Sequence, residues 1–451
     1  MKPHRLSLFI ALVVAPSVLQ AQTASESTGP STVISHVTVI DTHGGPPQRD
    51  VTVIIRGHRI EGIEKSKQES WHGATVLDGR GKFLIPGLWD MEVHLSWTRE
   101  CALPLLIANG VTDVRDMGGD FREIEDWRTK IASGLIIGPH ILQVGPMLNG
   151  KSFNQYQLVT GSPEETRAIV RTLKFLRVDG LEIERRISKD SYLALIEQAK
   201  HEGLPVGGHV PLSVRPDEVS NAGQTTIENV ESVYDGTFAE GIERKDLPNA
   251  IQRFLGSTDS DLLFRIFAKN RTAVTPVVGT FVWTLRQVAP GTTPDPNSRY
   301  VALSFRKQFA KTQIPAEELN MLNKELPQLL ETVRRMNKDG VTLLAGTDIA
   351  AIRIPGFSLH TELQELVAAG LSPLQAIQTA TLNPAIVLGK TDDFGSIETG
   401  KIADILLLDA DPLADIRNTQ RIGAVVIDGK PLRRVDLDGL LRDAERLANQ
   451  N

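Results

Sequence analysis

The amino-acid sequence predicts an α/β protein in which a (β/α)8 barrel, a TIM barrel, carries a small β domain built from both chain ends. Three observations support this prediction. Strand-like runs occupy both ends of the chain, strand-like and helix-like stretches alternate between them, and metal-binding side chains follow several of the central strands. Alternation of strands and helices over roughly 300 residues favours a parallel sheet and suits a closed eight-stranded barrel.

Composition narrows the class of protein. The 451 residues include 49 Lys and Arg against 55 Asp and Glu, which gives a formal net charge of −6. This mildly acidic balance argues against nucleic acid as a partner. The shares of hydrophobic residues, 41%, and charged residues, 23%, are those of a globular protein. A single cysteine, Cys101, excludes an internal disulfide and a cysteine-based zinc site.

Residues 1–21 have the layout of a secretory signal peptide. A basic start precedes an apolar run over 6–19, and cleavage is expected after Ala21. The alternative is an uncleaved signal anchor, although the run is short for a membrane span. Residues 22–31 are predicted to be a flexible leader. The mature protein is therefore expected to be exported, periplasmic or extracellular, without membrane contact after cleavage.

Residues 32–86 and 395–435 are predicted to form one composite β domain. A β-branched run at 51–55 lies between glycine and proline turns, and similar runs occur at 403–408 and 424–427. Such runs are typical of antiparallel strands joined by tight turns. Two unrelated β appendages are the alternative, but chain ends commonly lie close together.

Residues 87–394 are predicted to form the barrel, and 436–451 a C-terminal helix or tail. A helix capped by Ser188 is expected, and leucines on one side predict a long helix over about 315–339. The expected strands, besides the one that leads to His94, are 111–114, 141–144, 181–183, 206–209, 225–229, 274–278 and 341–344.

Metal-binding side chains stand where the predicted barrel strands end, which is where the chemistry of such barrels takes place. Glu92 and His94 are two residues apart, so alternation along a strand places both on one face. Oxygen and imidazole donors arranged in this way suit one or two divalent ions. The other candidate ligands are Glu182, His209, Asn229 and Asp348.

Three of these candidates are carboxylates, namely Glu92, Glu182 and Asp348. They cannot all stay ionised in a partly dry barrel mouth without cations or protons. A divalent ion is the simplest neutraliser, but Arg185 and Arg186 could supply the positive charge instead. The oxygen-rich set makes Mn, Mg or Fe competitive with Zn.

The chain resembles the amidohydrolase superfamily, in its imidazolonepropionase-like and Xaa-Pro dipeptidase-like branch. The resemblance covers about residues 32–432 and implies a (β/α)8 barrel, a composite β-sandwich and one or two divalent metals at the barrel mouth. The phrases that carry it are LIPGLWDMEVH (84–94), NGVTDVRDMGG (109–119), GLPVGGHVP (203–211), AGTD (345–348), TLNPA (381–385) and GSIETGKIAD (395–404).

Three of the ligand positions that the resemblance implies are altered in this chain. Glu92 stands where the family has the first histidine of an H-x-H pair, and Glu182 where it often has a carboxylated lysine. Asn229 replaces a further histidine, whereas His209 and Asp348 match the family pattern.

The resemblance also implies contacts with a small-molecule substrate. Glu184 stands where relatives often have a substrate-contacting tyrosine, and His140 where they more often have an arginine. His360, another family feature, is interpreted as structural. The loop 147–161 and the insertion 281–316, a lid or a surface excursion, would decide specificity. The sequence does not determine the oligomeric state.

The leading hypothesis is a metal-dependent hydrolase of a C–N bond in an amide, a cyclic amide or a dipeptide-like molecule. Asp348 would take a proton from a metal-activated water and pass it to the departing nitrogen. The alternative is a catalytically impaired pseudo-enzyme that binds a small ligand, which the substitutions Glu92, Glu182 and Asn229 favour. A plain scaffold protein has no feature in its favour. Metal content separates the first two hypotheses.

Overall fold

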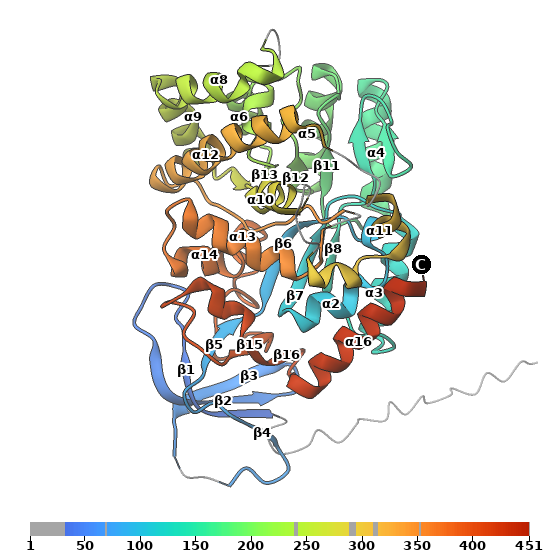
Figure 1. The fold of residues 1–451 in the computed structure, drawn as a ribbon. Coiled ribbons are helices and arrows are strands. Elements are labelled where there is room, and N and C mark those ends of the chain that lie inside the picture. Colours follow the sequence, from blue (N-terminus) through green and yellow to red (C-terminus); the bar gives the residue numbers. More distant parts are fainter. Residues whose placement is uncertain are drawn as a thin grey trace, which may run out of the picture.

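Strands from both chain ends hydrogen-bond into one sheet, the terminal sheet. In the computed structural model its order is β17-β16-β15-β5-β1-β2-β3, with β4 paired to β1, and it forms the lower end of the molecule in Figure 1. Its strands are β1 (Thr32–Val39), β2 (Gln48–Arg56), β3 (Arg59–Lys65), β4 (Thr75–Asp78), β5 (Phe83–Pro86), β15 (Ile405–Leu408), β16 (Ile422–Ile427) and β17 (Lys430–Arg433).

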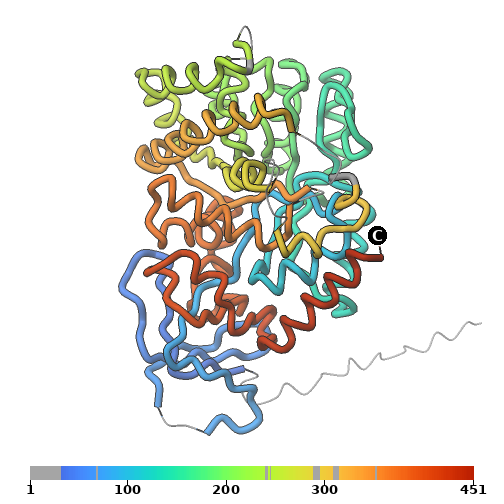
Figure 2. The backbone as a smooth tube through the Cα atoms, in the orientation of Figure 1, coloured from blue at the N-terminus to red at the C-terminus, as the bar shows by residue number. Residues whose placement is uncertain are grey.

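The structure describes residues 32–67, 70–238, 242–287, 295–309, 314–350 and 353–450. The predicted signal peptide and leader lie outside these residues. Within them, the tube in Figure 2 leaves the terminal sheet as β5 continues into β6 and returns to it through β15.

Strand β15 is buried on both faces and joins the two parts of the molecule. Ile405 and Leu407 belong to the core on one face of the terminal sheet. Leu406 and Leu408 point the other way, into the large core of the α/β part. Successive side chains of a strand face opposite sides, so a run of four apolar residues is what a doubly covered strand needs.

Eight segments of the α/β part follow one another around a ring, the strand ring. Regular pairing links β6 to β7 to β8, β11 to β12, and β13 to β14. Single backbone hydrogen bonds link the groups, such as Asp179 N to Gln143 O (2.8 Å) and Thr225 N to Val206 O (2.7 Å). The strands are β6 (Leu88–Val93), β7 (Val111–Asp116), β8 (His140–Gln143), β11 (Leu181–Ile183), β12 (Val206–Gly208), β13 (Thr226–Glu228) and β14 (Ala273–Thr275).

The eighth segment, 341–349, completes the ring without regular strand structure. Leu344 N donates to Val274 O, and Met91 N donates to Ala345 O, both at 2.9 Å. The prediction of a strand at 341–344 is therefore met only by a single isolated bridge, between Leu343 and Val274. The predicted strand 274–278 is too long, because β14 ends at Thr275 and a helix starts at Val278.

Helices cover the outside of the strand ring (Figure 1). Ser188 caps α5 as predicted, since its Oγ accepts from Ser191 N, and the predicted long helix is α12. The helices are α1 (Leu95–Thr98), α2 (Ala102–Ala108), α3 (Phe121–Ala132), α4 (Pro163–Phe175), α5 (Lys189–Glu202), α6 (Pro216–Ala222), α7 (Ser232–Asp235), α8 (Leu247–Leu255), α9 (Thr258–Asn270), α10 (Val278–Gln287), α11 (Leu303–Phe309), α12 (Ala316–Lys338), α13 (Phe357–Ala368), α14 (Pro373–Thr379), α15 (Leu382–Val387) and α16 (Arg434–Gln450).

Two short strands lie in the loop that was expected to bear on specificity. β9 (Met147–Asn149) pairs in parallel with β10 (Gln157–Val159) and touches β11 at Ile183. Short 3-10 helices lie at Arg244–Asp246, Pro296–Tyr300 and Ile416–Gln420.

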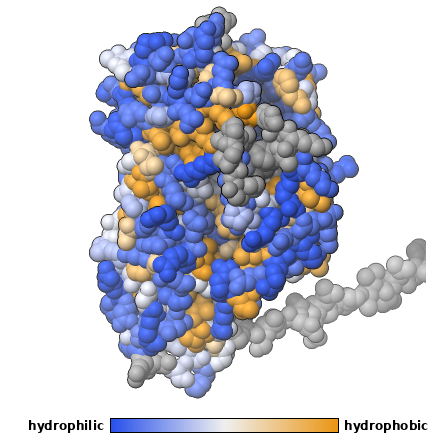
Figure 3. Space-filling model, viewed as in Figure 1, coloured by the Kyte–Doolittle hydropathy of each residue, from blue (hydrophilic) through white to orange (hydrophobic). Residues whose placement is uncertain are grey.

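The outer surface is mostly hydrophilic on the face that Figure 3 shows. Hydrophobic residues gather in its upper middle, in the region of α10 and α12. No helix within the described ranges is long and apolar enough to span a membrane.

Candidate metal centre

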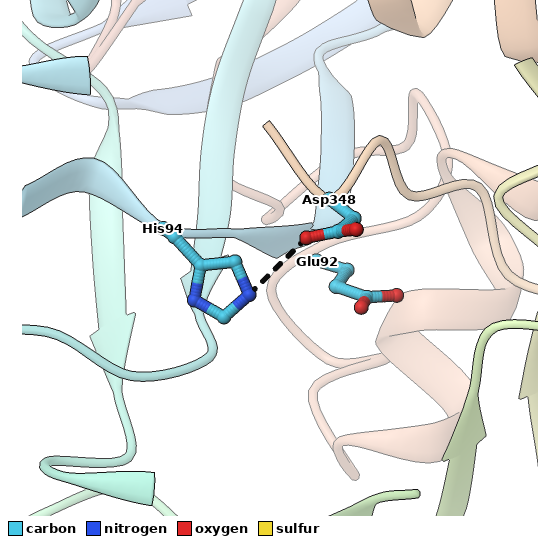
Figure 4. A group of neighbouring side chains, drawn as sticks. All are labelled: Glu92, His94 and Asp348. Atoms are coloured by element: carbon cyan, nitrogen blue, oxygen red, sulfur yellow. Dashed lines mark ion pairs between the residues drawn. The ribbon is translucent and has the colours of Figure 1, made fainter. Parts of the chain in front are cut away.

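Glu92, His94 and Asp348 meet at the C-terminal end of β6. Glu92 lies in β6 and His94 directly follows the strand, while Asp348 N donates to Glu92 O at 2.7 Å. Each side chain offers one ligand atom, and these atoms all lie within 4.8 Å of one another. Figure 4 shows His94 and Asp348 facing each other, with Glu92 beside them.

The ring of His94 is held so that Nε2 faces Asp348. Its Nδ1 lies 3.1 Å from Gly118 O, and because a carbonyl only accepts, Nδ1 carries the proton. Nε2 lies 3.3 Å from Asp348 Oδ1. Burial lowers the pKa of His94, but Asp348 and Glu182 outweigh it and raise it to about 10. Without another cation, the imidazole therefore holds a second proton.

Two buried aspartates hold the backbone around these side chains. Asp90 accepts from Thr347 N at 3.0 Å and from Thr347 Oγ1 at 2.6 Å. Asp116 accepts from Leu95 N at 2.8 Å. Burial raises the pKa of Asp90 to about 7 and that of Asp116 to about 6. Backbone on both sides of the centre is thus fixed by hydrogen bonds before any ligand binds.

The backbone is strained at two of the predicted ligands. Asp348 has φ 45° and Asn229 has φ 63°, in the left-handed region that non-glycine residues seldom adopt. Such strain costs energy and is concentrated at functional sites.

Glu182 acts electrostatically on His94 but is not part of the three-residue cluster. It is 4% exposed, and its Oε2 has no hydrogen-bond partner. A Cβ placed on Gly118, whose carbonyl holds His94, would lie 2.8 Å from that oxygen. Burial raises the pKa of Glu182 well above its ordinary value, and nearby His94 lowers it only partly.

Glu92 lies near three other acidic side chains, Asp348, Glu228 and Glu182. Burial, then Asp348 and Glu228, raise its pKa well above the ordinary value. Its Oε2 is buried and lacks a hydrogen-bond partner. A buried carboxylate oxygen without a partner is costly, so the centre has a polar group left for a cation to bind.

Arg353, which the sequence analysis missed, provides the positive charge beside Asp348. Its Nη1 lies 2.9 Å from Asp348 Oδ2. Burial alone would raise the pKa of Asp348, but Arg353 and His94 lower it below its ordinary value. No strand pattern singles out Arg353, because it follows the irregular segment that ends the strand ring.

Arg185 and Arg186, the alternative source of positive charge for the centre, have other partners in the structure. Arg185 pairs with Asp235 at 3.2 Å, and Arg186 stacks over the ring of Phe153.

His209, Asn229 and Glu184 lie outside the three-residue cluster. His209 Nδ1 lies 2.6 Å from Ser232 Oγ, and its Nε2 lies 4.0 Å from Glu184 Oε2. Burial, followed by Arg185, lowers the pKa of His209 to about 3, so its imidazole is neutral, as a metal ligand must be. Asn229 N donates to Thr275 O at 2.9 Å.

A buried ion pair crosses the inside of the strand ring below the centre. Arg115 of β7 bonds Glu228 of β13, and its Nε donates to Met91 O at 2.8 Å. Thr226 Oγ1 donates to Glu228 Oε1 at 2.5 Å. Neither Arg115 nor Glu228 was predicted from the sequence, although alternation within β13 places Thr226 and Glu228 on one face.

His140 does not lie at this centre, which corrects its predicted place among the substrate contacts. It is the first residue of β8, at the opposite edge of the strand ring from His94. Its Nε2 lies 3.1 Å from Asp404 Oδ2. His360 is structural, as interpreted, because its two ring nitrogens contact Thr419 Oγ1 and Asn109 O.

The residues of the centre fit a divalent ion. Two donors that share a tetrahedral ion at about 2.1 Å lie about 3.4 Å apart, close to the 3.3 Å between His94 Nε2 and Asp348 Oδ1. Glu92 Oε2 and Glu182 Oε2 are buried and have no hydrogen-bond partner. A neutral imidazole with carboxylates suits zinc, manganese or iron.

Comparisons with known proteins place the chain in a family. The family model described as amidohydrolase matches residues 83–432. The imidazolonepropionase of Alkaliphilus oremlandii is 21% identical over 416 residues, which cover 84% of this chain and 90% of that enzyme. Relatives with 42–43% identity match over only 69–74 residues, 11–12% of their own length.

Solved structures show the same likeness. Bottromycin amidohydrolase matches with a TM-score of 0.76 and 21% identity, over 92% of this chain and 90% of that one. A protein from Bifidobacterium longum described as a candidate prolidase matches with a TM-score of 0.68 and 26% identity, over 92% and 99%. The likeness shows an α/β fold of the TIM-barrel type. The chain belongs to the amidohydrolase family, as its sequence motifs predicted.

Proposed function

We propose that this protein is an exported, metal-dependent amidohydrolase that hydrolyses a C–N bond of a small molecule. The observation that carries the proposal is the meeting of Glu92, His94 and Asp348 within 4.8 Å at the strand ends. Its strand ring would be the (β/α)8 barrel of the family, and the terminal sheet would form the β-sandwich domain.

Glu92, His94 and Asp348 would hold one ion, of Zn, Mn, Fe or Mg. Glu182 would complete its ligands or bridge to a second ion, with His209 and Asn229 as the weaker second site. A bound divalent ion at this place lowers the pKa of a water molecule and polarises a carbonyl group.

Asp348 would carry the proton. Arg353 holds its Oδ2 at 2.9 Å, while Oδ1 faces His94 Nε2 at 3.3 Å. A carboxylate in this place takes a proton from the attacking water and delivers it to the departing nitrogen. Arg353 also fixes the orientation of the carboxylate before the substrate arrives.

The substrate class is an amide, a cyclic amide or a dipeptide-like molecule. Relatives include an imidazolonepropionase and a candidate prolidase, whose names indicate cyclic amide and dipeptide substrates. Glu184 remains a proposed substrate contact. It accepts from Gln157 Nε2 at 2.8 Å, which links it to the loop 147–161.

A pseudo-enzyme that binds a small ligand is the alternative. The ion pair between Arg353 and Asp348 favours it, because a guanidinium neutralises the carboxylate where an ion would otherwise do so. In that case Asp348 would have no free role as a proton carrier.

Amine release from a panel of Xaa-Pro dipeptides, N-acyl amino acids and cyclic amides tests the function. We expect mature protein to hydrolyse at least one class, to lose activity in EDTA, and to regain it with Mn²⁺ or Zn²⁺. The E92Q/H94Q variant is the control without a metal centre. Metal-loaded, folded protein that hydrolyses none of the panel would support the pseudo-enzyme.

Export gives a separate prediction. Because residues 1–21 have the layout of a signal peptide, we expect exported protein to begin at Gln22 and to fold without the removed segment. Mass spectrometry of protein from the periplasm or medium measures this. A mass that includes Met1 would contradict cleavage.

A further inference from the structure

A second cluster of metal-binding side chains lies at the opposite edge of the strand ring from the candidate centre. Asp113 and His140 sit at paired positions near the starts of β7 and β8. Asp404 comes from the chain just before β15 of the terminal sheet, where its carbonyl accepts from Gly87 N at 2.8 Å. One ligand atom of each lies within 4.8 Å of the others.

Each of the two buried aspartates has one oxygen engaged and one left over. Asp113 is 1% exposed; its Oδ2 accepts from Thr112 Oγ1 at 2.7 Å, and its Oδ1 has no hydrogen-bond partner. Asp404 is 5% exposed; its Oδ1 accepts from Asp428 N at 2.7 Å, and its Oδ2 has none. Buried, unpartnered carboxylate oxygens are costly unless a cation or donor satisfies them.

The distances around His140 are those of donors that share an ion. Its Nε2 lies 3.1 Å from Asp404 Oδ2 and 3.5 Å from Asp428 Oδ1. The edge of a tetrahedral zinc site is about 3.4 Å. His140 Nε2 and Asp404 Oδ2 are close enough to form an ion pair when the imidazole is protonated.

The surroundings leave room for an ion and leave the cluster negative. Asp113, His140 and Asp428 line a cavity of about 410 Å³. Of the cationic side chains on its wall, Arg128 is engaged by Asp179 at 3.2 Å. Lys390 remains to offset Asp113 and Asp428 on the same wall.

We propose that Asp113, His140 and Asp404, joined by Asp428, form a second divalent-cation site. One imidazole nitrogen with carboxylate oxygens suits Zn²⁺ or Mn²⁺. The ligands come from both the strand ring and the terminal sheet. A bound ion therefore links these two parts of the molecule and has a structural role.

A proton is the rival occupant. Burial lowers the pKa of His140, but Asp404 and Asp113 outweigh it and raise it to about 10. An imidazolium could thus neutralise the cluster without any ion. The two occupants differ in one measurable way, because only the ion adds to the metal content.

Counting ions in variants tests the proposal. Protein stripped with chelator is reloaded with Zn²⁺, passed through gel filtration and analysed for zinc. We expect H140Q and D113N to retain one equivalent fewer than wild type after gel filtration. The matched control is H201Q, which removes an exposed histidine beside Glu202 and should change nothing.

A variant of the first centre separates this proposal from the proposed function. E92Q/H94Q should still take up one equivalent, whether or not the protein is a hydrolase. Zinc content in folded H140Q or D113N equal to that of wild type would overturn the second site. An E92Q/H94Q protein that binds no zinc would also overturn the second site. This test does not depend on whether H140Q and D113N fold.

Discussion

Replacing Asp348 by asparagine is expected to lower amide hydrolysis about a thousandfold, within the range for loss of a general acid–base group, while an ion stays bound. Asp348 Oδ1 lies 3.3 Å from His94 Nε2. Asparagine keeps an amide oxygen that can occupy this place, but the amide cannot accept the proton of the attacking water. Turnover of the best substrate in the panel, with zinc content measured on the same sample, checks both parts.

Asp179→Asn is the matched control for this substitution. Asp179 pairs with Arg128 at 3.2 Å and accepts from Gln143 N at 2.9 Å, away from the candidate centre. Its loss should leave hydrolysis per folded molecule unchanged. Asp348→Asn protein that retains its ion and hydrolyses within about tenfold of wild type would remove Asp348 from the proton-carrying role.

Replacing Arg115 by methionine is expected to lower the free energy of unfolding by about 3–5 kcal/mol, the cost of breaking a buried ion pair from one side. Glu228 would remain buried without its cation, and Met91 O would lose the donor that now lies 2.8 Å away. Urea denaturation of the chelator-stripped protein, followed by circular dichroism, measures the change without any contribution from ions.

The exposed pair of Arg167 and Glu197, at 2.8 Å, provides the control. Arg167→Met should change the free energy of unfolding by no more than about 1 kcal/mol, because exposed ion pairs contribute little. If the Arg115→Met and Arg167→Met proteins have the same free energy of unfolding, the stability of the fold does not depend on the positive charge that Arg115 places beside Glu228.

Much of the fold could be predicted from local pattern. β-branched runs marked β2, β15 and β16 of the terminal sheet, and Ser188 marked the start of α5. The segment 341–349 could not be predicted, because single hydrogen bonds to β6 and β14, and no regular ladder, fix its place. The early start of α10 likewise depends on packing outside the local sequence.

The candidate site was predictable where one strand presents two candidate ligands. Alternation along β6 sufficed for Glu92 and His94, and motif resemblance supplied Asp348. The pairing of Arg115 with Glu228 spans 113 residues, and that of His140 with Asp404 joins two parts of the chain. Such contacts arise from the way the ring and the terminal sheet meet, and no local pattern contains that information.

Anomalous diffraction at the metal's absorption edge, from crystals of mature protein grown without chelator, tests the central claim most directly. We predict a peak about 2.0–2.3 Å from His94 Nε2 and from oxygens of Glu92 and Asp348. Density that shows Arg353 bonded to Asp348, His94 bonded to the same carboxylate, and no anomalous peak between them even after soaking in Mn²⁺ or Zn²⁺ would contradict it.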